Sequence, residues 1–186
     1  TQVATVVGHA REQVIPLVEG DTQVVVQEVQ NGTAGAVLAC ADAFAGFDGS
    51  LSVLTGDCPL IKPETIARLA QVRDENNAAV VVLTMKLNDP TGYGRIIRDA
   101  DGQVERIVEQ KDCTPEQDAN LLECNAGCYA FDGAQLAAHI DEIGNDNAQA
   151  EYYLPDMLEI LKGHGQAVSI FHCDDYRDGL GVNSRI

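Results

Sequence analysis

The sequence lacks the features that mark a membrane protein, a zinc-binding module or a nucleic-acid-binding protein. No apolar run approaches the roughly 20 residues that a helix needs to cross a bilayer. None of the six cysteines belongs to a Cys-x-x-Cys pair and the four histidines show no metal-ligand spacing, which argues against a structural zinc site. Basic residues number 12 against 29 acidic ones, and the net charge of −17 argues against binding of nucleic acid. A small phosphorylated ligand stays possible, because backbone N–H groups and Mg²⁺ can hold it.

The composition favours one globular domain in a reducing compartment. The 186 residues suit a single core, and 45% of them are apolar. No secretory signal pattern stands at the start, where residues 2–7 already read as a strand. Several cysteines lie in apolar runs and read as small buried side chains, so we expect a cytoplasmic protein.

Strand-like and helix-like segments alternate along the chain. We expect strands at 2–7, 22–27, 51–55, 78–85, 121–131 and 167–173, and helices near 10–19, 33–44, 62–74, 133–140 and from about 151 to 162. The run 78–85 is apolar throughout, which is typical of a strand buried on both faces. Residues 95–98 and 104–109 flank an Asp-Gly turn and predict a hairpin. The fold class is therefore α/β: a Rossmann-like, mixed and mostly parallel sheet with flanking helices and an inserted antiparallel hairpin.

The sharpest feature is the segment that follows the strand at 51–55. It carries one carboxylate, Asp57, between a glycine and Pro59 at the carboxyl end of that strand. In open α/β sheets ligands bind beyond these strand ends, and an Asp there can hold a divalent cation against a phosphate. The alternative is that Gly56 and Asp57 merely turn the chain.

Four other segments each allow a functional and a purely structural interpretation. Gly32 and Thr33 open a helix, either as a plain N-cap or as a site for an anion or a base carbonyl. Residues 89–95 (DPTGYGR) permit close approach of a flat or sugar ligand, or form an ordinary turn. Glu109 ends a strand, where it accepts bonds from vicinal sugar hydroxyls or forms a surface pair with Lys111. Asn125 shares a strand face with Gly127 and Tyr129, as a pocket wall or as a buried, satisfied amide.

Taken in order, these segments resemble one family. The chain is similar to the uridyltransferase domain of bacterial bifunctional enzymes that combine N-acetylglucosamine-1-phosphate uridyltransferase with glucosamine-1-phosphate acetyltransferase. The resemblance runs from about residue 3 to residue 185. It rests on six blocks at 27–33, 56–60, 89–95, 108–112, 147–153 and 181–185.

The resemblance implies a set of site residues. Gln27, Gly32 and Thr33 would contact uracil, and Gly94, Glu109 and Asn125 would bind the N-acetylglucosamine moiety. Asp57 and Asn183 would hold Mg²⁺ and act as the catalytic pair. The cleft would be lined by Thr55, Gly56 and Tyr93. Ala126 stands where the family usually has a small hydroxyl residue, which would alter a hydrogen bond near the sugar.

The resemblance also implies a reaction. UTP and N-acetylglucosamine-1-phosphate would give UDP-N-acetylglucosamine and pyrophosphate, a step in cell-wall precursor synthesis. The nucleophile is already an anionic phosphate oxygen, so we expect no general base and no nucleophilic triad. Two alternatives are a nucleotidyltransferase for another hexose-1-phosphate and a non-catalytic module that binds sugar nucleotides.

Two family features have no counterpart in the sequence. They are the first strand with its Gly-rich phosphate loop and the acetyltransferase half of hexapeptide repeats. We therefore expect residues 1–186 to form a uridyltransferase domain without that loop, with little turnover alone. The family's trimers depend largely on the acetyltransferase half, so this chain is expected to be monomeric.

Overall fold

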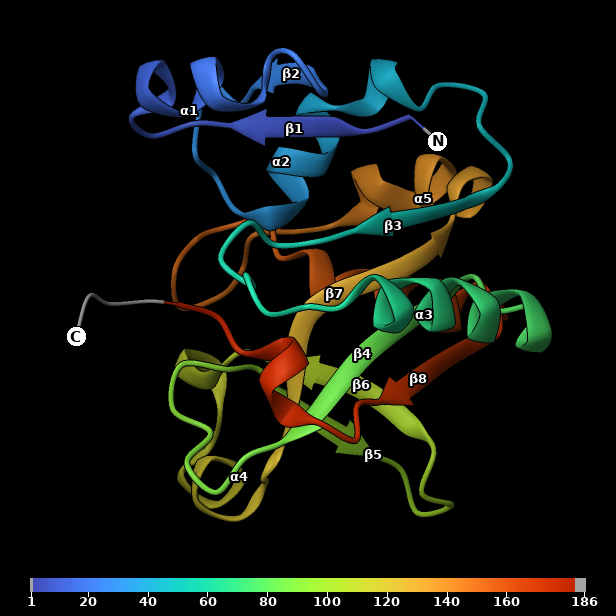
Figure 1. Cartoon of the computed structure of the whole chain (residues 1–186). Coiled ribbons are helices and arrows are strands. Elements are labelled where there is room, and N and C mark those ends of the chain that lie inside the picture. Colours follow the sequence, from blue (N-terminus) through green and yellow to red (C-terminus); the bar gives the residue numbers. More distant parts are fainter. Residues whose placement is uncertain (1, 183–186) are drawn as a thin grey trace.

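The computed structural model describes residues 2–182. Its N-terminal part is a small layer made of strand β1 (Ala4–Val7), helix α1 (Arg11–Val18) and strand β2 (Gln23–Val26). The two strands pair in parallel as a separate two-stranded sheet, at the top of Figure 1. No residue of α1 is buried, so this layer contributes little to the main core.

The main sheet has six strands, β3 (Ser50–Val53), β4 (Val80–Lys86), β5 (Arg95–Arg98), β6 (Val104–Val108), β7 (Glu123–Asp132) and β8 (Val168–His172). The long strand β7 is its axis, because it pairs antiparallel with β3, β4 and β5. Strand β8 extends β4 in parallel, and β5 and β6 form the expected hairpin. Four strands thus share one direction, while β6 and β7 run the opposite way.

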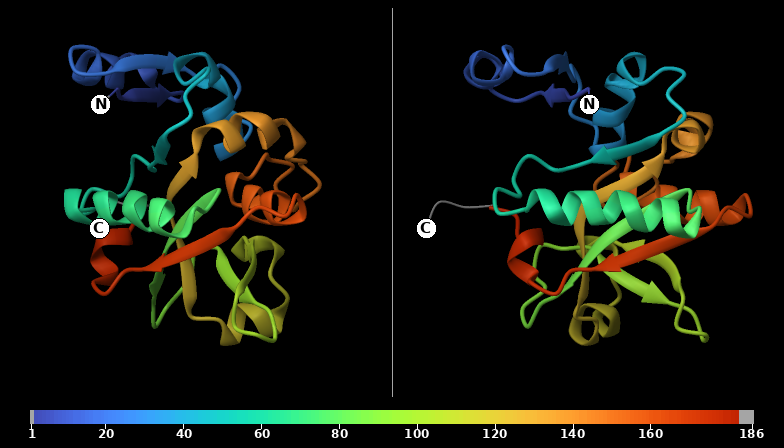
Figure 2. Two further views of the ribbon diagram at one scale, coloured as in Figure 1. Left: turned by 90° about the vertical axis from the view of Figure 1, so that its right-hand side faces the viewer. Right: turned by 45° about the vertical axis from the view of Figure 1, so that its right-hand side comes forward.

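Helices cover both faces of this sheet. On one face α3 (Pro63–Asn76) packs Leu69 and Val72 against a core cluster that includes Val81 and Leu83. On the other face lie α2 (Thr33–Ala39), α5 (Gly133–His139) and α6 (Met157–Gly163), over a second cluster that includes Phe131. Figure 2 shows α3 and α6 on opposite sides of the sheet. A short helix α4 (Pro115–Asn120) follows the hairpin.

The expected fold class is confirmed, and so is the doubly buried strand, since residues 80–85 of β4 are all buried. Two helix boundaries were wrong. The helix expected from residue 33 to 44 ends at Ala39, with a 3-10 turn following over Ala41–Ala43. The helix expected from about 151 begins only at Met157, after a 3-10 turn over Leu154–Asp156.

The late start of α6 has a local cause. The N–H of Tyr152 donates to the carbonyl of Asn31 (2.8 Å), and the Tyr152 carbonyl accepts from the N–H of Ala34 (3.0 Å). These groups are therefore engaged outside any helix, and Pro155 fits only the first turn that follows. No helix within residues 2–182 combines the length and the apolar character that a membrane crossing requires.

Candidate active site

Asp57 lies in an exposed corner just beyond the carboxyl end of β3. Gly56 and Asp57 are exposed, whereas Cys58 is buried and anchors the corner. The Cys58 thiol lies 3.2 Å from the hydroxyl of Thr55 and points back into the core. A methyl group built on Gly56 would meet no atom within 4 Å, so a ligand can approach this backbone closely.

The C-terminal segment returns to this corner. The N–H of Val182 donates to the carbonyl of Asp57 (2.8 Å), and the N–H of Gly181 donates to the phenol oxygen of Tyr93 (3.0 Å). Asn183, the second expected metal ligand, follows Val182 directly and lies outside the described residues. Tyr93 and Asp57, which are far apart in sequence, are thereby joined through residues 181 and 182.

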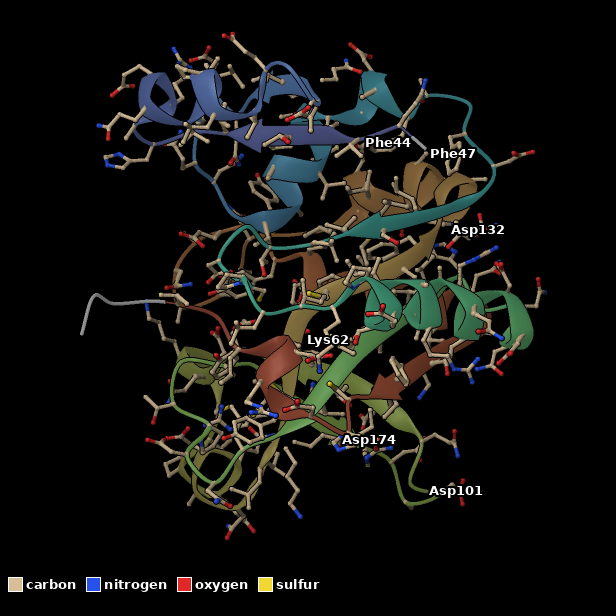
Figure 3. The ribbon with its side chains drawn as sticks, in the orientation of Figure 1. Phe44, Phe47, Lys62, Asp101, Asp132 and Asp174 are labelled. Carbon is tan, nitrogen blue, oxygen red and sulfur yellow. The ribbon has the colours of Figure 1, made fainter. Side chains whose placement is uncertain are left out.

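A buried carboxylate anchors the turn before that segment. Asp178 accepts a hydrogen bond from the Thr65 hydroxyl (2.6 Å) and forms an ion pair with Lys62 (2.7 Å). Burial opposes ionisation, yet these partners lower the pKa of Asp178. Figure 3 places Lys62 at the start of α3, beside this turn. The anchor therefore fixes where residues 181 and 182 pass.

The three residues expected at the sugar lie together. Gly94 is buried, and its carbonyl accepts the N–H of Asn125 (3.0 Å). A methyl group on Gly94 would stand 2.9 Å from the Glu109 Oε1 atom, so the carboxylate packs against this glycine. The Asn125 amide donates to the Tyr129 phenol (2.7 Å) and accepts from the N–H of Gly127 (3.0 Å).

The Glu109 carboxylate is free to accept hydrogen bonds from a ligand. No hydrogen bond from a residue within 2–182 reaches its side chain. Burial, then the negative charges of Asp156 and Asp112, raise the pKa of Glu109, while Arg95 opposes the rise. Burial likewise raises the pKa of Asp156 to about 6, with Glu159 and Asp112 adding to the effect. A hydroxyl-rich ligand would supply the donors that Glu109 lacks.

The residues expected at uracil form a separate group at the start of α2. The Gln27 amide donates to the carbonyl of Gly32 (3.1 Å), and the Thr33 hydroxyl accepts from the N–H of Leu154 (2.9 Å). Gly32 has φ +113°, and a methyl group there would stand 2.4 Å from the Tyr152 carbonyl oxygen. Only glycine fits this position, because both the backbone conformation and the close approach exclude a side chain.

The loop at 147–153 connects the start of α2 to the segment that follows β6. Its Ala148 N–H donates to Asp112 (2.8 Å), and the side chains of Lys111 and Gln149 are in contact. At its other end Tyr152 pairs with Asn31. The Asn147 side chain holds the loop in place through the carbonyl of Glu151 (2.6 Å). The loop is thus hydrogen-bonded at one end to residues 111 and 112, just after Glu109, and at the other end to residues 31 and 34 at the start of α2.

Arg95 supports the site and received no role from sequence reasoning. Its guanidinium is almost fully buried, at 1% exposure, and donates to the carbonyls of Pro90 (2.8 Å) and Tyr93 and to Asp118 (2.7 Å). It therefore clamps the turn that carries Tyr93 and Gly94. Its place in the block 89–95 was the one sign in the sequence that Arg95 belongs to the site. An arginine at the start of a strand is otherwise expected to be an exposed cation.

Two further placements bear on the expectations. Ala126 is buried beside Gly179 and Met85, in the core cluster under α3. One surface hollow touches none of the expected site residues. It is lined by Lys86, Ile96, Ile97, Arg98, Gln117, Asn120, Leu121, Leu122, Glu123 and His172.

Curated relatives match the whole chain. The bifunctional protein GlmU of Lactobacillus gasseri is 46% identical over 185 residues, that of Listeria monocytogenes serotype 4a (strain HCC23) is 44% identical over 185, and that of Corynebacterium efficiens is 42% identical over 193. In each case the match covers 100% of this chain and 40% of the relative, so the chain spans about two fifths of the relatives' length.

A solved structure has a similar fold, and a family profile matches most of the sequence. A Bacillus anthracis protein assigned as a glucose-1-phosphate thymidylyltransferase, in complex with sucrose, superposes with a TM-score of 0.71. It is 18% identical, and the match covers 92% of this chain and 67% of that one. The profile of the family described as nucleotidyl transferase matches residues 11–177. Since that match includes most of the sequence, the chain belongs to the nucleotidyl transferase family.

Proposed function

We propose that this chain forms the uridyl-transfer part of an enzyme that converts UTP and N-acetylglucosamine-1-phosphate to UDP-N-acetylglucosamine and pyrophosphate. The observation that carries the proposal is the hydrogen bond from the N–H of Val182 to the carbonyl of Asp57, which holds the last described residue against the corner that carries the exposed carboxylate. The identity of 42% to 46% with GlmU proteins over the whole chain supports the choice of substrates.

The sugar end of the substrate would bind at Gly94, Glu109 and Asn125. Glu109 would accept hydrogen bonds from ring hydroxyls, and Gly94, which has no side chain, lets its carboxylate pack close to the backbone there. Asn125 is held rigidly by its contacts with Tyr129 and Gly127, so its peptide and amide groups keep a fixed orientation. Tyr93 and Thr55 would line the wall between this group and Asp57.

The nucleotide end would bind at the start of α2. The Gln27 amide donates to Asn31 (3.2 Å) and to the Gly32 carbonyl (3.1 Å), which leaves its carbonyl oxygen to accept the ring N–H of a pyrimidine. Thr33 and the first N–H groups of α2 lie beside it.

A divalent cation fits at Asp57. The carboxylate is exposed, its nearest described partner is the weak contact with the Cys58 thiol at 3.9 Å, and hard oxygen ligands of this kind suit Mg²⁺. We propose Asp57 and Asn183 as its ligands and as the catalytic pair. A bound Mg²⁺ would neutralise charge between the two phosphates. The protein's own residues would align the attacking phosphate oxygen with the α-phosphorus, a step that needs no general base.

The remaining parts of the proposal concern the cell. We propose a cytoplasmic role in cell-wall precursor synthesis, within a bifunctional protein that assembles as a trimer through a region other than residues 1–186. The identity with GlmU proteins supports this role, since those relatives are described as bifunctional.

Product binding provides a direct test. Calorimetry of the 186-residue chain with UDP-N-acetylglucosamine should give one site per chain whose affinity rises when Mg²⁺ is added. UDP-glucose and dTDP-glucose should bind more weakly, because each lacks a group that the two ends of the site would contact. Equal affinity for all three sugar nucleotides, or no binding by the folded chain, would contradict the proposal.

A further inference from the structure

Two histidines and one glutamate meet on the face of the molecule that carries α5 and α6. His139 is the last residue of α5, Glu142 lies in the 3-10 turn that follows, and His164 is the C-cap residue of α6. One ligand atom from each of the three residues lies within 4.8 Å of the other two. The two histidines are 25 positions apart, and the four histidines accordingly show no metal-ligand spacing in the sequence.

Both imidazoles point at the same carboxylate. The Nδ1 atom of His139 lies 2.7 Å from Glu142 Oε1, and the Nε2 atom of His164 lies 2.8 Å from Oε2 and 3.0 Å from Oε1. The two rings stack with centroids 4.1 Å apart and planes inclined by 27°. The three ligand atoms thus converge on one point, which a pair of independent surface contacts would not require.

This set of atoms matches a transition-metal site with an open position. Two imidazole nitrogens and one carboxylate oxygen suit Zn²⁺, Ni²⁺ or Cu²⁺ and suit Mg²⁺ poorly. Tetrahedral ligation at about 2.0–2.1 Å places ligand atoms about 3.3 Å apart. Glu142 would therefore withdraw by about 0.5 Å, and its 46% exposed side chain is free to do so.

We propose that His139, Glu142 and His164 form a binding site for a divalent transition metal, with Zn²⁺ as the reference ion, independent of the Asp57 corner. The site would join the end of α5 to the end of α6. The His164 and Glu142 side chains are 44% and 46% exposed, so an ion and a fourth ligand from solvent can reach it. Binding to the folded chain alone would stabilise the fold by mass action.

The first test is a titration of the reduced chain with Zn²⁺, in the presence of millimolar Mg²⁺. One Zn²⁺ per chain should bind and raise the melting temperature. Substituting Co²⁺ should give visible absorption typical of nitrogen and oxygen ligands, without the charge-transfer band of a thiolate. Such a band would assign the ion to the cysteines and overturn the proposal.

Matched variants separate the site from other donors. His164→Gln and Glu142→Gln should each lose most of the Zn²⁺ affinity and the thermal shift. His9→Gln should behave as the wild type, because His9 is an exposed histidine outside the cluster. Unchanged Zn²⁺ affinity in both cluster variants, with the fold intact by circular dichroism, would refute the site. Displacement of Zn²⁺ by millimolar Mg²⁺ would also refute it.

Discussion

The backbone N–H of Val182 donates a 2.8 Å hydrogen bond to the carbonyl oxygen of Asp57. This contact pins the C-terminal segment to the corner after β3 while leaving the Asp57 carboxylate exposed. Nearby, the buried Asp178 holds the preceding turn through Thr65 and Lys62. Backbone hydrogen bonds therefore position this corner, and the Asp57 side chain stays free to bind a cation.

Asp57→Asn should remove most of the catalytic rate while sparing the fold. Loss of a metal ligand costs several kcal/mol of transition-state stabilisation, so we expect a fall in kcat of roughly 100-fold or more in the complete protein. Stability should change by less than about 0.5 kcal/mol, because the side chain is exposed. The measurement is pyrophosphate release, with Asp48→Asn, another exposed aspartate, as the control. An Asp57→Asn enzyme with wild-type kcat would exclude this carboxylate as a ligand.

Gly32→Ala should disrupt the junction between α2 and the loop at 147–153. The added methyl group would stand 2.4 Å from the Tyr152 carbonyl oxygen, on a backbone with φ +113°. We expect a loss of about 3 kcal/mol in unfolding free energy, measured by urea denaturation. Gly20→Ala is the control, since a methyl group there meets nothing within 4 Å. Equal effects of the two substitutions would show that the junction tolerates movement.

Glu109→Gln should selectively weaken the binding of N-acetylglucosamine-1-phosphate. A carboxylate that accepts hydrogen bonds contributes about 1.5–3 kcal/mol, so KM for N-acetylglucosamine-1-phosphate should rise roughly 10-fold or more, with KM for UTP unchanged. Because the pKa of Glu109 is raised, acidification should also raise the wild-type KM for the sugar phosphate as the carboxylate is protonated. Glu105→Gln, an exposed glutamate on the preceding strand β6, is the control. A parallel rise in both KM values would point to a general distortion instead.

Asp156→Asn should stabilise the protein at neutral pH. The folded state raises the pKa of Asp156 from 3.8 to about 6, so the folded chain binds the proton more tightly than the unfolded chain. Stability from this group is therefore present at acid pH and falls as pH rises from about 4 to about 6. The amide should add about 2 kcal/mol at pH 7.5 and nothing at pH 4. The measurement is urea denaturation at both pH values, with Asp146→Asn, a substitution at an exposed aspartate, as the control. A gain in stability that is the same at both pH values would assign the effect to packing.

The fold was predictable where burial dictates the residues. The apolar run that became β4 is buried on both faces, and the alternation at 124–130 separates two core clusters as expected. The direction of β7 was not predictable, because strand pairing far along the chain leaves no local pattern. Helix α4 was missed although Thr114 and Gln117 form a capping box, a spacing that a sequence can display.

The candidate site was predictable as a set of blocks and not as an arrangement. The resemblance grouped Gly94, Glu109 and Asn125, and the structure brings these three together. Sequence could not reveal that Arg95 is buried and holds the turn before Gly94, since its partners are backbone carbonyls. Nor could it place Tyr152 against Gly32, which shifted the start of α6.

The most direct test of the account is the substrate preference of the complete protein. Pyrophosphate release should be measured with UTP, dTTP, CTP and ATP, each against the 1-phosphates of N-acetylglucosamine, glucose and galactose. UTP with N-acetylglucosamine-1-phosphate should give the highest kcat/KM, and removal of Mg²⁺ should abolish the rate. A higher kcat/KM for another pair, or turnover that persists without a divalent cation, would contradict the account.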